Sequence, residues 1–474
     1  SLSNFSCKLT SYRTRLALIK TTEKNLKMKQ VQKTLLYISL IVVFLTLLSY
    51  YSNFIFLLGK GDQSFGGLAR PMATFATFPS KVRQILVEEI GGVPPTYVKK
   101  DQTFREMNSL KYDLFGLNAY WNNEVKRWDV TLFNFKNDSI IYTWHIDKAG
   151  LDLAGHRQFP NSEVRNPILL ENKSLVVAND MTPNLIRIDS NSNIVWGNHE
   201  MIFHHAINMD ADSNIWACTT DRTGGTKAGK PIKNLNGHTM PFLEDYITKI
   251  DKNTGKVLFK KGVSEILLEN NYKNFVYGFS NPPHNLNDNL HLNDIEPVME
   301  DSRYWKKGDL FLSMRHRSLV LLYRPSTNKI LRLIYGPFIN QHDVDVISDK
   351  EISIFNNNYI VDGEIQTGKK FEQDKEARTD IDSLVSSEIM IYNFEDSTFR
   401  LHLNKFLKEE KVMTYSQGFL QILKNGDVYV EAQNFGKLYI VNENGFVLKK
   451  EIKTSGSEYV HMPNWIRIFE ELNF

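Results

Sequence analysis

Imidazole, guanidinium and amide side chains lie just before or after short β-rich runs, at similar places in successive stretches of the chain. They are His204, His205, His291, Asn293, Arg315, His316 and His342. A neutral imidazole is a good nucleophile near neutral pH, and an imidazolium is a proton donor. A guanidinium offers a planar fork of donors to the oxygens of an anion. These residue types can therefore supply a nucleophile, a proton donor and an anion-binding group.

A single histidine in a β-rich protein is usually an ordinary hydrogen-bonding residue. We assign that role to His145, His156, His199, His238 and His402. The cluster differs because place in the repeat and residue type recur together. We expect one pocket, lined by His205, His291, Asn293, Arg315 and His342. Histidines also bind zinc, but Arg315 would repel a cation in the same pocket, so neither a metal nor a cofactor is expected.

The elements that must position these residues form a repeat of about six units of roughly 40 residues. Each unit consists of short β-rich runs separated by polar turns, as in YITKIDKNTGKVLFK at residues 246–260. Alternate residues of such runs face opposite sides, and Asn253-Thr254-Gly255 is typical of a turn between antiparallel strands. The repeat predicts an all-β, six-bladed β-propeller, in which distant residues converge on a central channel. The alternative is two separate β domains.

A stretch without charged residues, residues 35–58, precedes the repeats. At about 1.5 Å per residue it can cross the roughly 30 Å apolar core of a bilayer. Eight basic residues and one acid come before it, which places the N-terminus in the cytoplasm. The alternative is a cleaved signal peptide, whose apolar region is normally about 7–15 residues long.

The predicted organisation is a basic cytoplasmic segment, a single transmembrane helix, a membrane-proximal connecting region and the propeller. Their boundaries are 1–34, 35–58, 59–110 and 111–474. The propeller is then expected on the periplasmic, extracytoplasmic side of the inner (cytoplasmic) membrane. Cys7 and Cys218 lie on opposite sides of the apolar stretch, so no disulfide and no cysteine-based metal site is expected. The net charge of +3 gives no indication of nucleic-acid binding, and the oligomeric state stays open.

Several motifs, taken in order, resemble the bacterial arylsulfotransferase family from about residue 161 to 467. They are HHAINMD, HLNDI followed by GDLFLSMRH, GPFINQHD followed by ISIFNNN, YSQGFLQILKNGDVYVEAQNFGKLYIV, and HMPNWIRI. The resemblance implies a six-bladed propeller that transfers a sulfuryl group from an aryl sulfate to a phenol, without a nucleotide donor. It also implies a transiently sulfated histidine and ping-pong kinetics.

By motif, His342 matches the histidine that becomes sulfated in this family. The residues that match the sulfate-holding and proton-handling groups are His205, His291, Asn293 and Arg315. His204 and His205 would face opposite ways on a strand. The resemblance of the motif favours His205, and His204 is kept as a substrate-binding candidate. Either His291 or His205 could protonate the departing phenolate. Asp343 has no matched role; it could orient the His342 ring or cap the following strand.

Two other functions are compatible with a propeller. A quinoprotein dehydrogenase has repeats similar to DKNTGKVLF, but it needs a calcium site of carboxylate and amide oxygens and carries a recurring tryptophan. A non-catalytic propeller that binds partners in the cell envelope is the second alternative. The combination of His342 and Arg315 argues against it, because a scaffold needs neither.

Overall fold

The computed structural model describes most of the chain after the first 27 residues. The described ranges are 28–55, 75, 94, 96–146, 163–220, 232–233, 239–240, 242–278, 288–359, 386–456 and 458–472. The chain divides into two compact units, Ser1–Leu86 and Val87–Phe474. Most of the predicted basic segment, residues 1–27, lies outside the described residues, as do residues 56–58 of the predicted transmembrane segment.

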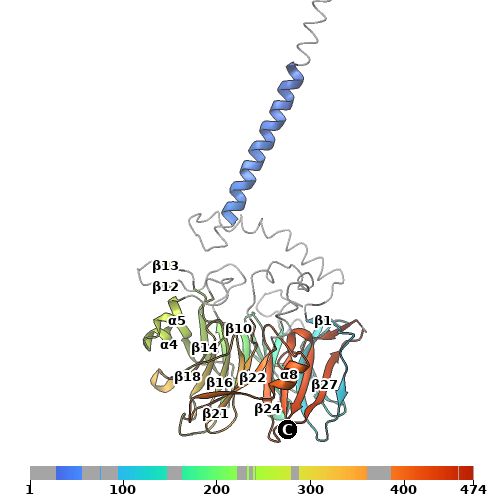
Figure 1. Cartoon of the computed structure of the whole chain (residues 1–474), viewed down its shortest axis with the longest axis vertical. Coiled ribbons are helices and arrows are strands. Elements are labelled where there is room, and N and C mark those ends of the chain that lie inside the picture. Colours follow the sequence, from blue (N-terminus) through green and yellow to red (C-terminus); the bar gives the residue numbers. More distant parts are fainter. Residues whose placement is uncertain are drawn as a thin grey trace, which may run out of the picture. The chain divides into compact units, whose positions relative to one another are not determined.

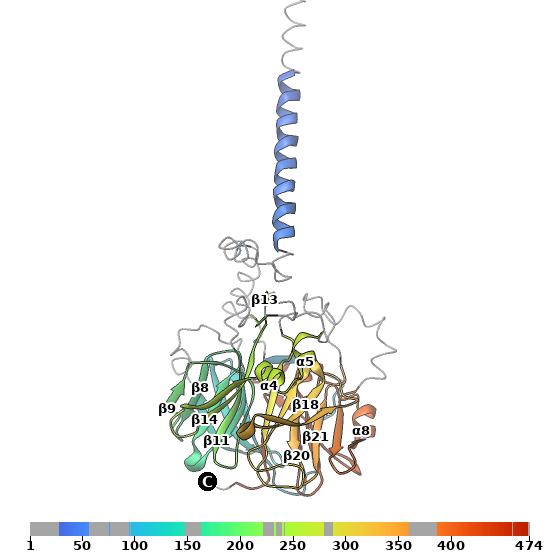
Figure 2. The ribbon, with the colours of Figure 1, turned by 90° about the vertical axis from the view of Figure 1, so that its left-hand side faces the viewer.

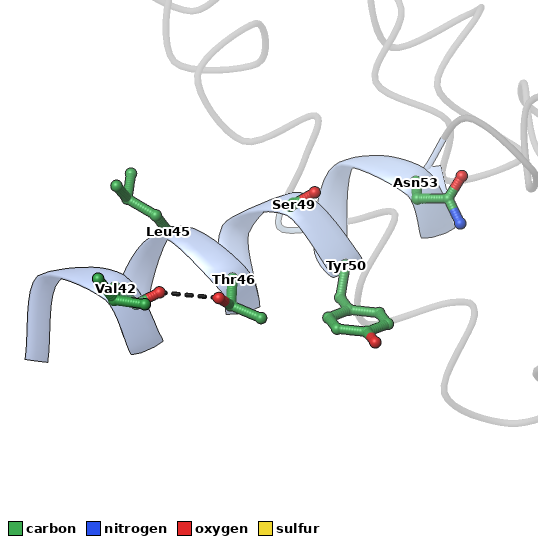
Figure 3. A pocket seen from close by; sticks show the side chains of 6 residues that line it. All are labelled: Val42, Leu45, Thr46, Ser49, Tyr50 and Asn53. Carbon is green, nitrogen blue, oxygen red and sulfur yellow. Dashed lines mark hydrogen bonds between the residues drawn. The ribbon is translucent and has the colours of Figure 1, made fainter. Parts of the chain in front are cut away.

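The first unit contains one long helix, Met28–Ile55, drawn in blue in Figure 1. It is long and apolar enough to cross a membrane, and most of its apolar side chains are exposed, although Phe54 is buried. The same length and composition also suit a signal sequence. The Thr46 hydroxyl donates to the Val42 carbonyl at 2.8 Å, which satisfies its polar group within the helix (Figure 3). These two residues line a shallow pocket on the helix with Leu45, Ser49, Tyr50 and Asn53. The helix is therefore a membrane anchor or a signal sequence.

The second unit is a β-propeller of antiparallel sheets (Figures 1 and 2). Among the described residues, five of these sheets have four strands each. The first blade consists of β29 (Arg467–Phe469), β3 (Phe115–Asn122), β4 (Arg127–Asn134) and β5 (Ile140–Ile146). The second consists of β6 (Val164–Leu169), β7 (Leu175–Asn179), β8 (Asn184–Ile188) and β9 (Ile194–Asn198).

The next three blades follow the same order along the chain. The third has β10 (Ile202–Met209), β11 (Asn214–Thr220), β14 (Asp245–Asp251) and β15 (Val257–Gly262). The fourth has β16 (Leu292–Pro297), β17 (Leu310–Met314), β18 (Leu319–Arg324) and β19 (Lys329–Tyr335). The fifth has β20 (His342–Val346), β21 (Glu351–Asn356), β22 (Glu388–Asn393) and β23 (Thr398–Leu401).

A larger, seven-stranded sheet contains the last repeat. It comprises β24 (Phe419–Ile422), β25 (Val428–Ala432), β26 (Lys437–Asn442), β27 (Gly445–Lys453), β28 (Tyr459–His461), β1 (Tyr97–Lys99) and β2 (Met107–Asn108). The described part thus shows five regular four-stranded blades, one fewer than the six expected, because β24–β27 belong to this larger sheet. Strands β1 and β2, which come before the expected boundary at residue 111, pair with β28 and β27.

Short elements complete the described part of this unit. They are the two-stranded ribbon of β12 (Ile232–Lys233) and β13 (Thr239–Met240), and the helices α4 (Val263–Glu269), α5 (Lys273–Tyr277) and α8 (Asn404–Glu409). Helix α4 packs against β14, β15 and β19, and α8 packs against β22 (Figure 1). The predicted turn at 253–255 joins β14 to β15. Gly255 has φ +70° there, and a Cβ would lie 2.5 Å from the Trp196 ring, so glycine is required.

Ring closure comes from the C-terminus. Strand β29 pairs antiparallel with β3, so the first blade combines strands from both ends of the unit. The Arg467 guanidinium donates to the carbonyls of Pro167 and Ile207, at 3.0 and 2.8 Å, and thereby ties β29 to β6 and β10. Apolar cores fill the space between neighbouring sheets; one core, for example, joins Phe311 of β17 to Ile352 of β21. This closure holds the first strands of successive blades side by side.

Candidate functional site

The predicted site residues lie at irregularities near the start of β10, β16 and β20. Strand β10 shifts register between Phe203 and Ile207, a stretch that contains His205. His205 and His291 both have φ 56°, a left-handed conformation that is costly for a residue with a side chain. Such bulges re-aim side chains, and strained backbone of this kind is held by its surroundings at functional sites. The local backbone therefore turns these imidazoles away from the ladder.

Buried or half-buried aspartates accept backbone N–H groups near the starts of these strands, from the preceding part of the ring. Asp180 accepts the His205 backbone N–H at 3.0 Å, and Asp245 accepts that of Leu292 at 2.9 Å. The same contact recurs between Asp294 and Val344, at 2.9 Å, and between Asp343 and Leu420, at 2.8 Å. The Asp343 side chain thus accepts a hydrogen bond from the backbone at the start of β24. This contact matches neither of the two roles considered from the sequence, because Leu420 belongs to β24 and not to the following strand β21 or to the His342 ring.

Two imidazoles face each other in the site. The Nε2 atoms of His205 and His291 are 3.0 Å apart. On its other side, His205 Nδ1 lies 3.3 Å from Arg165 Nη1, whereas His291 Nδ1 lies 2.8 Å from Asp288 Oδ2. The centroid of the His205 ring is 5.9 Å from that of the His342 ring, so the structure brings all three predicted histidines together.

His342 is buried and held at both ring nitrogens. Its Nδ1 is 2.6 Å from Asn357 Oδ1, and its Nε2 accepts the Gln417 backbone N–H at 3.1 Å. Asn357 Nδ2 donates to two backbone carbonyls, of Thr414 and Gln417, which identifies the Oδ1 atom as the acceptor toward His342. The proton of His342 is therefore on Nδ1, and the lone pair is on Nε2. Burial lowers the pKa of His342 well below its usual value, and Arg315 lowers it further.

Arg315 is a buried cation without an acidic partner at ion-pair distance among the described residues. Its Nη1 donates to His316 Nε2 at 2.9 Å. Burial lowers the pKa of the guanidinium to about 10, and Asp288 partly offsets this effect. Asn293 is also buried, and its amide donates to the Gln341 carbonyl at 2.7 Å. A buried guanidinium that lacks a carboxylate partner is suited to bind an anion.

His204, the neighbour of His205, is directed elsewhere. Its Nε2 lies 3.3 Å from Asp245 Oδ1, and both side chains are buried. The ring centroids of His204 and His205 are 5.1 Å apart, but only His205 contacts His291 through a hydrogen bond. His204 therefore supports the site from behind, and His205 is the member of the pair that reaches it.

Several residues of the site were not predicted from the sequence. They are Arg165, Asp288, Asn357, Gln417 and Trp465, while His316 was singled out by residue type but not placed in the pocket. Arg165 could have been found, because it lies at the start of β6 just as the histidines lie at the starts of later first strands. The Trp465 ring stacks on the His205 ring and is nearly perpendicular to the His342 ring, and the ring centroids are 6.3 Å apart in both pairs. Gln417 acts through its backbone N–H, which residue type does not reveal.

One group in the site has metal-ligating side chains. The ligand atoms of Asp288, His291 and His316 lie within 4.8 Å of one another. Each already has a hydrogen-bond partner, since His316 Nδ1 donates to the Asp288 carbonyl at 2.7 Å and His291 Nδ1 contacts the Asp288 carboxylate. The next nitrogen, His316 Nε2, accepts from a guanidinium. The arrangement is a hydrogen-bonded network that suits proton and anion chemistry better than it suits cation binding.

Comparison with known proteins gives one informative match. The family described as Arylsulfotransferase (ASST) matches residues 166–452, which is more than half of the chain. This range includes His205, His291, Arg315 and His342. No curated protein matches the chain.

Solved structures that resemble the chain are distant. A protein of unknown function from Bacteroides caccae is 13% identical, with a TM-score of 0.44, and covers 76% of this chain and 100% of its own. A catalytically inactive virginiamycin B lyase from Staphylococcus aureus with quinupristin is 9% identical, with a TM-score of 0.37 and coverage of 76% and 97%. Apo AztD from Citrobacter koseri is 9% identical, with a TM-score of 0.34 and coverage of 75% and 97%.

Proposed function

Because the chain belongs to the arylsulfotransferase family, a family of sulfuryl-transfer enzymes, we propose that it carries the sulfuryl group on His342 between an aryl sulfate and a phenol. One observation carries this assignment: a neutral His342, with its lone pair on Nε2, lies in the same site as a buried guanidinium that has no acid partner at ion-pair distance in the described part of the chain. The imidazole is the nucleophile, and Arg315 is the anion-binding group. No nucleotide donor, metal or cofactor takes part.

The first half-reaction forms a nitrogen–sulfur bond and breaks a sulfur–oxygen bond. His342 Nε2 attacks sulfur, and the electron pair of the broken bond goes to the aryl oxygen, which takes a proton and leaves as a phenol. The Gln417 N–H, released from Nε2, can then donate to a sulfuryl oxygen beside Arg315. The acceptor phenol reverses these steps, because its oxygen attacks the sulfated His342 and its proton passes to the enzyme.

The remaining parts of the proposal concern organisation. Strands β24–β27 form the same antiparallel meander as the regular blades, and β24 lies beside β20, so we take them as a sixth blade. We take the helix Met28–Ile55 as a single membrane anchor, with the propeller on the periplasmic side, because of the basic residues that precede it. His204 and Asn293 are assigned to support of the substrate site.

The test uses the full chain in detergent, with a chromogenic aryl sulfate as donor and a phenol as acceptor. We expect ping-pong kinetics and an added sulfo group on the peptide that contains His342. His342→Ala should abolish both half-reactions, because no covalent intermediate can form. His145→Ala, on the outer strand β5, is the control and should keep full activity. Sequential kinetics without a labelled peptide, or a label on another histidine, would overturn the assignment.

A further inference from the structure

His205 and His291 have the same residue type and backbone conformation, but charged groups of opposite sign lie behind them. Behind His205 is Arg165, whose guanidinium is held by Glu163 at 2.7 Å and by Asp180 at 3.4 Å. Behind His291 is the carboxylate of Asp288. A guanidinium can only donate, and an ionised carboxylate can only accept.

These partners determine the direction of every hydrogen bond between them. Arg165 donates to His205 Nδ1, so the proton of a neutral His205 must be on Nε2. That Nε2–H then donates to His291 Nε2, across 3.0 Å. His291 in turn carries its proton on Nδ1 and donates it to Asp288. The lone pair of His291 is therefore on the nitrogen that faces the site, while His205 offers an N–H there.

On the basis of this network and of the function proposed above, we propose that His291 alone carries the transferred proton. Asp288 and Arg165 are the positioning residues, because they determine which of the two imidazoles accepts that proton. When a phenol gives its proton to His291 Nε2, the Asp288 carboxylate balances the charge of the imidazolium. A proton on His205 would instead face the Arg165 guanidinium. His205 stays neutral and acts as a hydrogen-bond donor to the reacting oxygen.

The proposed cycle balances without an external acid. In the donor half-reaction the His291 imidazolium gives its Nε2 proton to the aryl oxygen as the sulfur–oxygen bond breaks. In the acceptor half-reaction, His291 Nε2 recovers a proton from the incoming phenol. The contact between the two Nε2 atoms requires a lone pair on His291, so it is made by the neutral form of His291, which is the form that accepts the phenol proton in the acceptor half-reaction. Burial is the main cause that lowers the pKa of His205, and the electrostatic effects of His291, His204, Arg165 and His342 lower it further, in agreement with its neutral role.

The decisive experiment is the Asp288→Asn substitution in the full chain, assayed with two donors. One is phenyl sulfate, whose leaving phenolate is strongly basic; the other is a nitrophenyl sulfate, whose leaving group needs little protonation. We expect kcat/KM to fall roughly 100-fold or more for phenyl sulfate, and less than tenfold for the nitrophenyl ester, because proton transfer contributes about 10²–10⁴-fold where it is needed. Asp288→Glu should restore part of the activity toward phenyl sulfate.

The pH–rate profile gives a readout that a merely structural role would not change. The acceptor half-reaction needs neutral His291, so it loses activity as the pH falls; removal of the carboxylate should move that acidic limb to lower pH. Among the described residues, the other charged or titratable groups around the two imidazoles are Glu163, Asp180, Arg315, His316, His342, and the pair of His204 and Asp245, and the substitution retains all of them.

The matched control is Asp129→Asn. It removes the carboxylate of another histidine–aspartate contact of 2.8 Å, between Asp129 on β4 and His145 Nδ1 on β5, outside the site. This variant should keep the wild-type dependence on leaving group and on pH. Equal sensitivity of Asp288→Asn and wild type to the leaving group would overturn the proposal. Loss of wild-type activity in a chelator would also overturn it, since a metal would then occupy the Asp288 contact.

A second measurement applies even if Asp288→Asn does not fold. Nitrogen-15 NMR of histidine-labelled wild type should show a proton on Nε2 of His205 and on Nδ1 of His291. An imidazolium at His205, or the opposite tautomer at His291, would contradict the proposal that His291 alone carries the proton. Absence of sulfuryl transfer by the wild type would instead contradict the proposed function, so the two failures are distinguishable.

Discussion

His205 lies in β10 and His291 directly precedes β16; both have a φ of 56°, and they contact each other through the same atom, Nε2. The partner of Nδ1 differs in charge: Arg165 in one case and Asp288 in the other. A cation behind an imidazole favours its neutral form, and an anion favours its charged form. Within a repeat, the partner on the far side of the ring therefore decides whether an imidazole is a hydrogen-bond donor or a proton carrier.

The largest expected difference in activity between the two positions comes from replacing each histidine with glutamine. Glutamine keeps an N–H donor and cannot accept a transferable proton. We expect His291→Gln to lower kcat/KM for phenyl sulfate by about 10²–10⁴-fold, and His205→Gln to lower it by about tenfold or less. Steady-state kinetics of the two variants, side by side, provide the measurement. Equal losses at the two positions would show that both imidazoles carry the proton.

A smaller effect separates the two arginines of the site. Arg315 has no acidic partner at ion-pair distance among the described residues, whereas Arg165 is held by Glu163 and Asp180. Arg315→Lys keeps the charge but loses the planar fork, so we expect roughly 10–100-fold lower activity, with the larger change in binding of the sulfuryl group. Arg165→Lys should cost only a few-fold. A greater loss from Arg165→Lys than from Arg315→Lys would reverse their assigned roles.

The smallest predicted effect is on the stability of the fold and comes from His316. Its ring stacks on the His291 ring, with the two centroids 4.3 Å apart. Burial lowers the pKa of His316 from 6.5 to about 3. The unfolded chain therefore binds this proton first as the pH falls, so this group's contribution to stability is lost progressively from pH 6.5 toward pH 3. His316→Gln should make the decline of the unfolding temperature between neutral and mildly acidic pH shallower, by about a few degrees.

Several buried carboxyl groups have the opposite effect on the pH dependence of stability. The unfolding temperatures of wild type and His316→Gln must therefore be compared over the same pH range. Four carboxyl groups have their pKa raised to about 7, mainly by burial: Asp294, Asp345, Glu244 and Glu431. In the folded state they take up protons before the unfolded chain does, so they stabilise the fold as the pH falls. The difference between the two unfolding curves isolates His316. Parallel curves would mean that His316 does not stay neutral in the fold.

Local pattern was enough to predict the propeller class and the main histidines. Alternation of side chains, turns such as that at Gly255 and a repeat of similar units are properties of neighbouring residues, so they can be read along the chain. The apolar helix was predictable for the same reason, although its composition suits both an anchor and a signal sequence. The same phase of His205, His291 and His342 in successive repeats then indicated a common pocket, because equivalent positions in a propeller converge.

Two features depend on tertiary structure: the size of the last sheet, and which of His204 and His205 reaches the site. Strands β1 and β2 come from residues ahead of the predicted boundary and extend the sheet of β24–β27, a pairing across more than 300 residues that no local pattern encodes. Alternation predicts that His204 and His205 face opposite ways. The bulge in β10, held by Asp180, and the contact of His204 with Asp245 decide which of them reaches the site.

Tertiary structure also decided the chemistry of each imidazole. Arg165 is 40 residues from His205, and Gln417 is 75 residues from His342, so closure of the ring brings them together. Even Asp288, three residues before His291, is a partner only because the backbone turns at the start of β16. The sequence by itself determined which groups could do chemistry, since residue type and repeat phase are local. Which of them accepts, donates or attacks depends on contacts between blades, and those exist only in the folded ring.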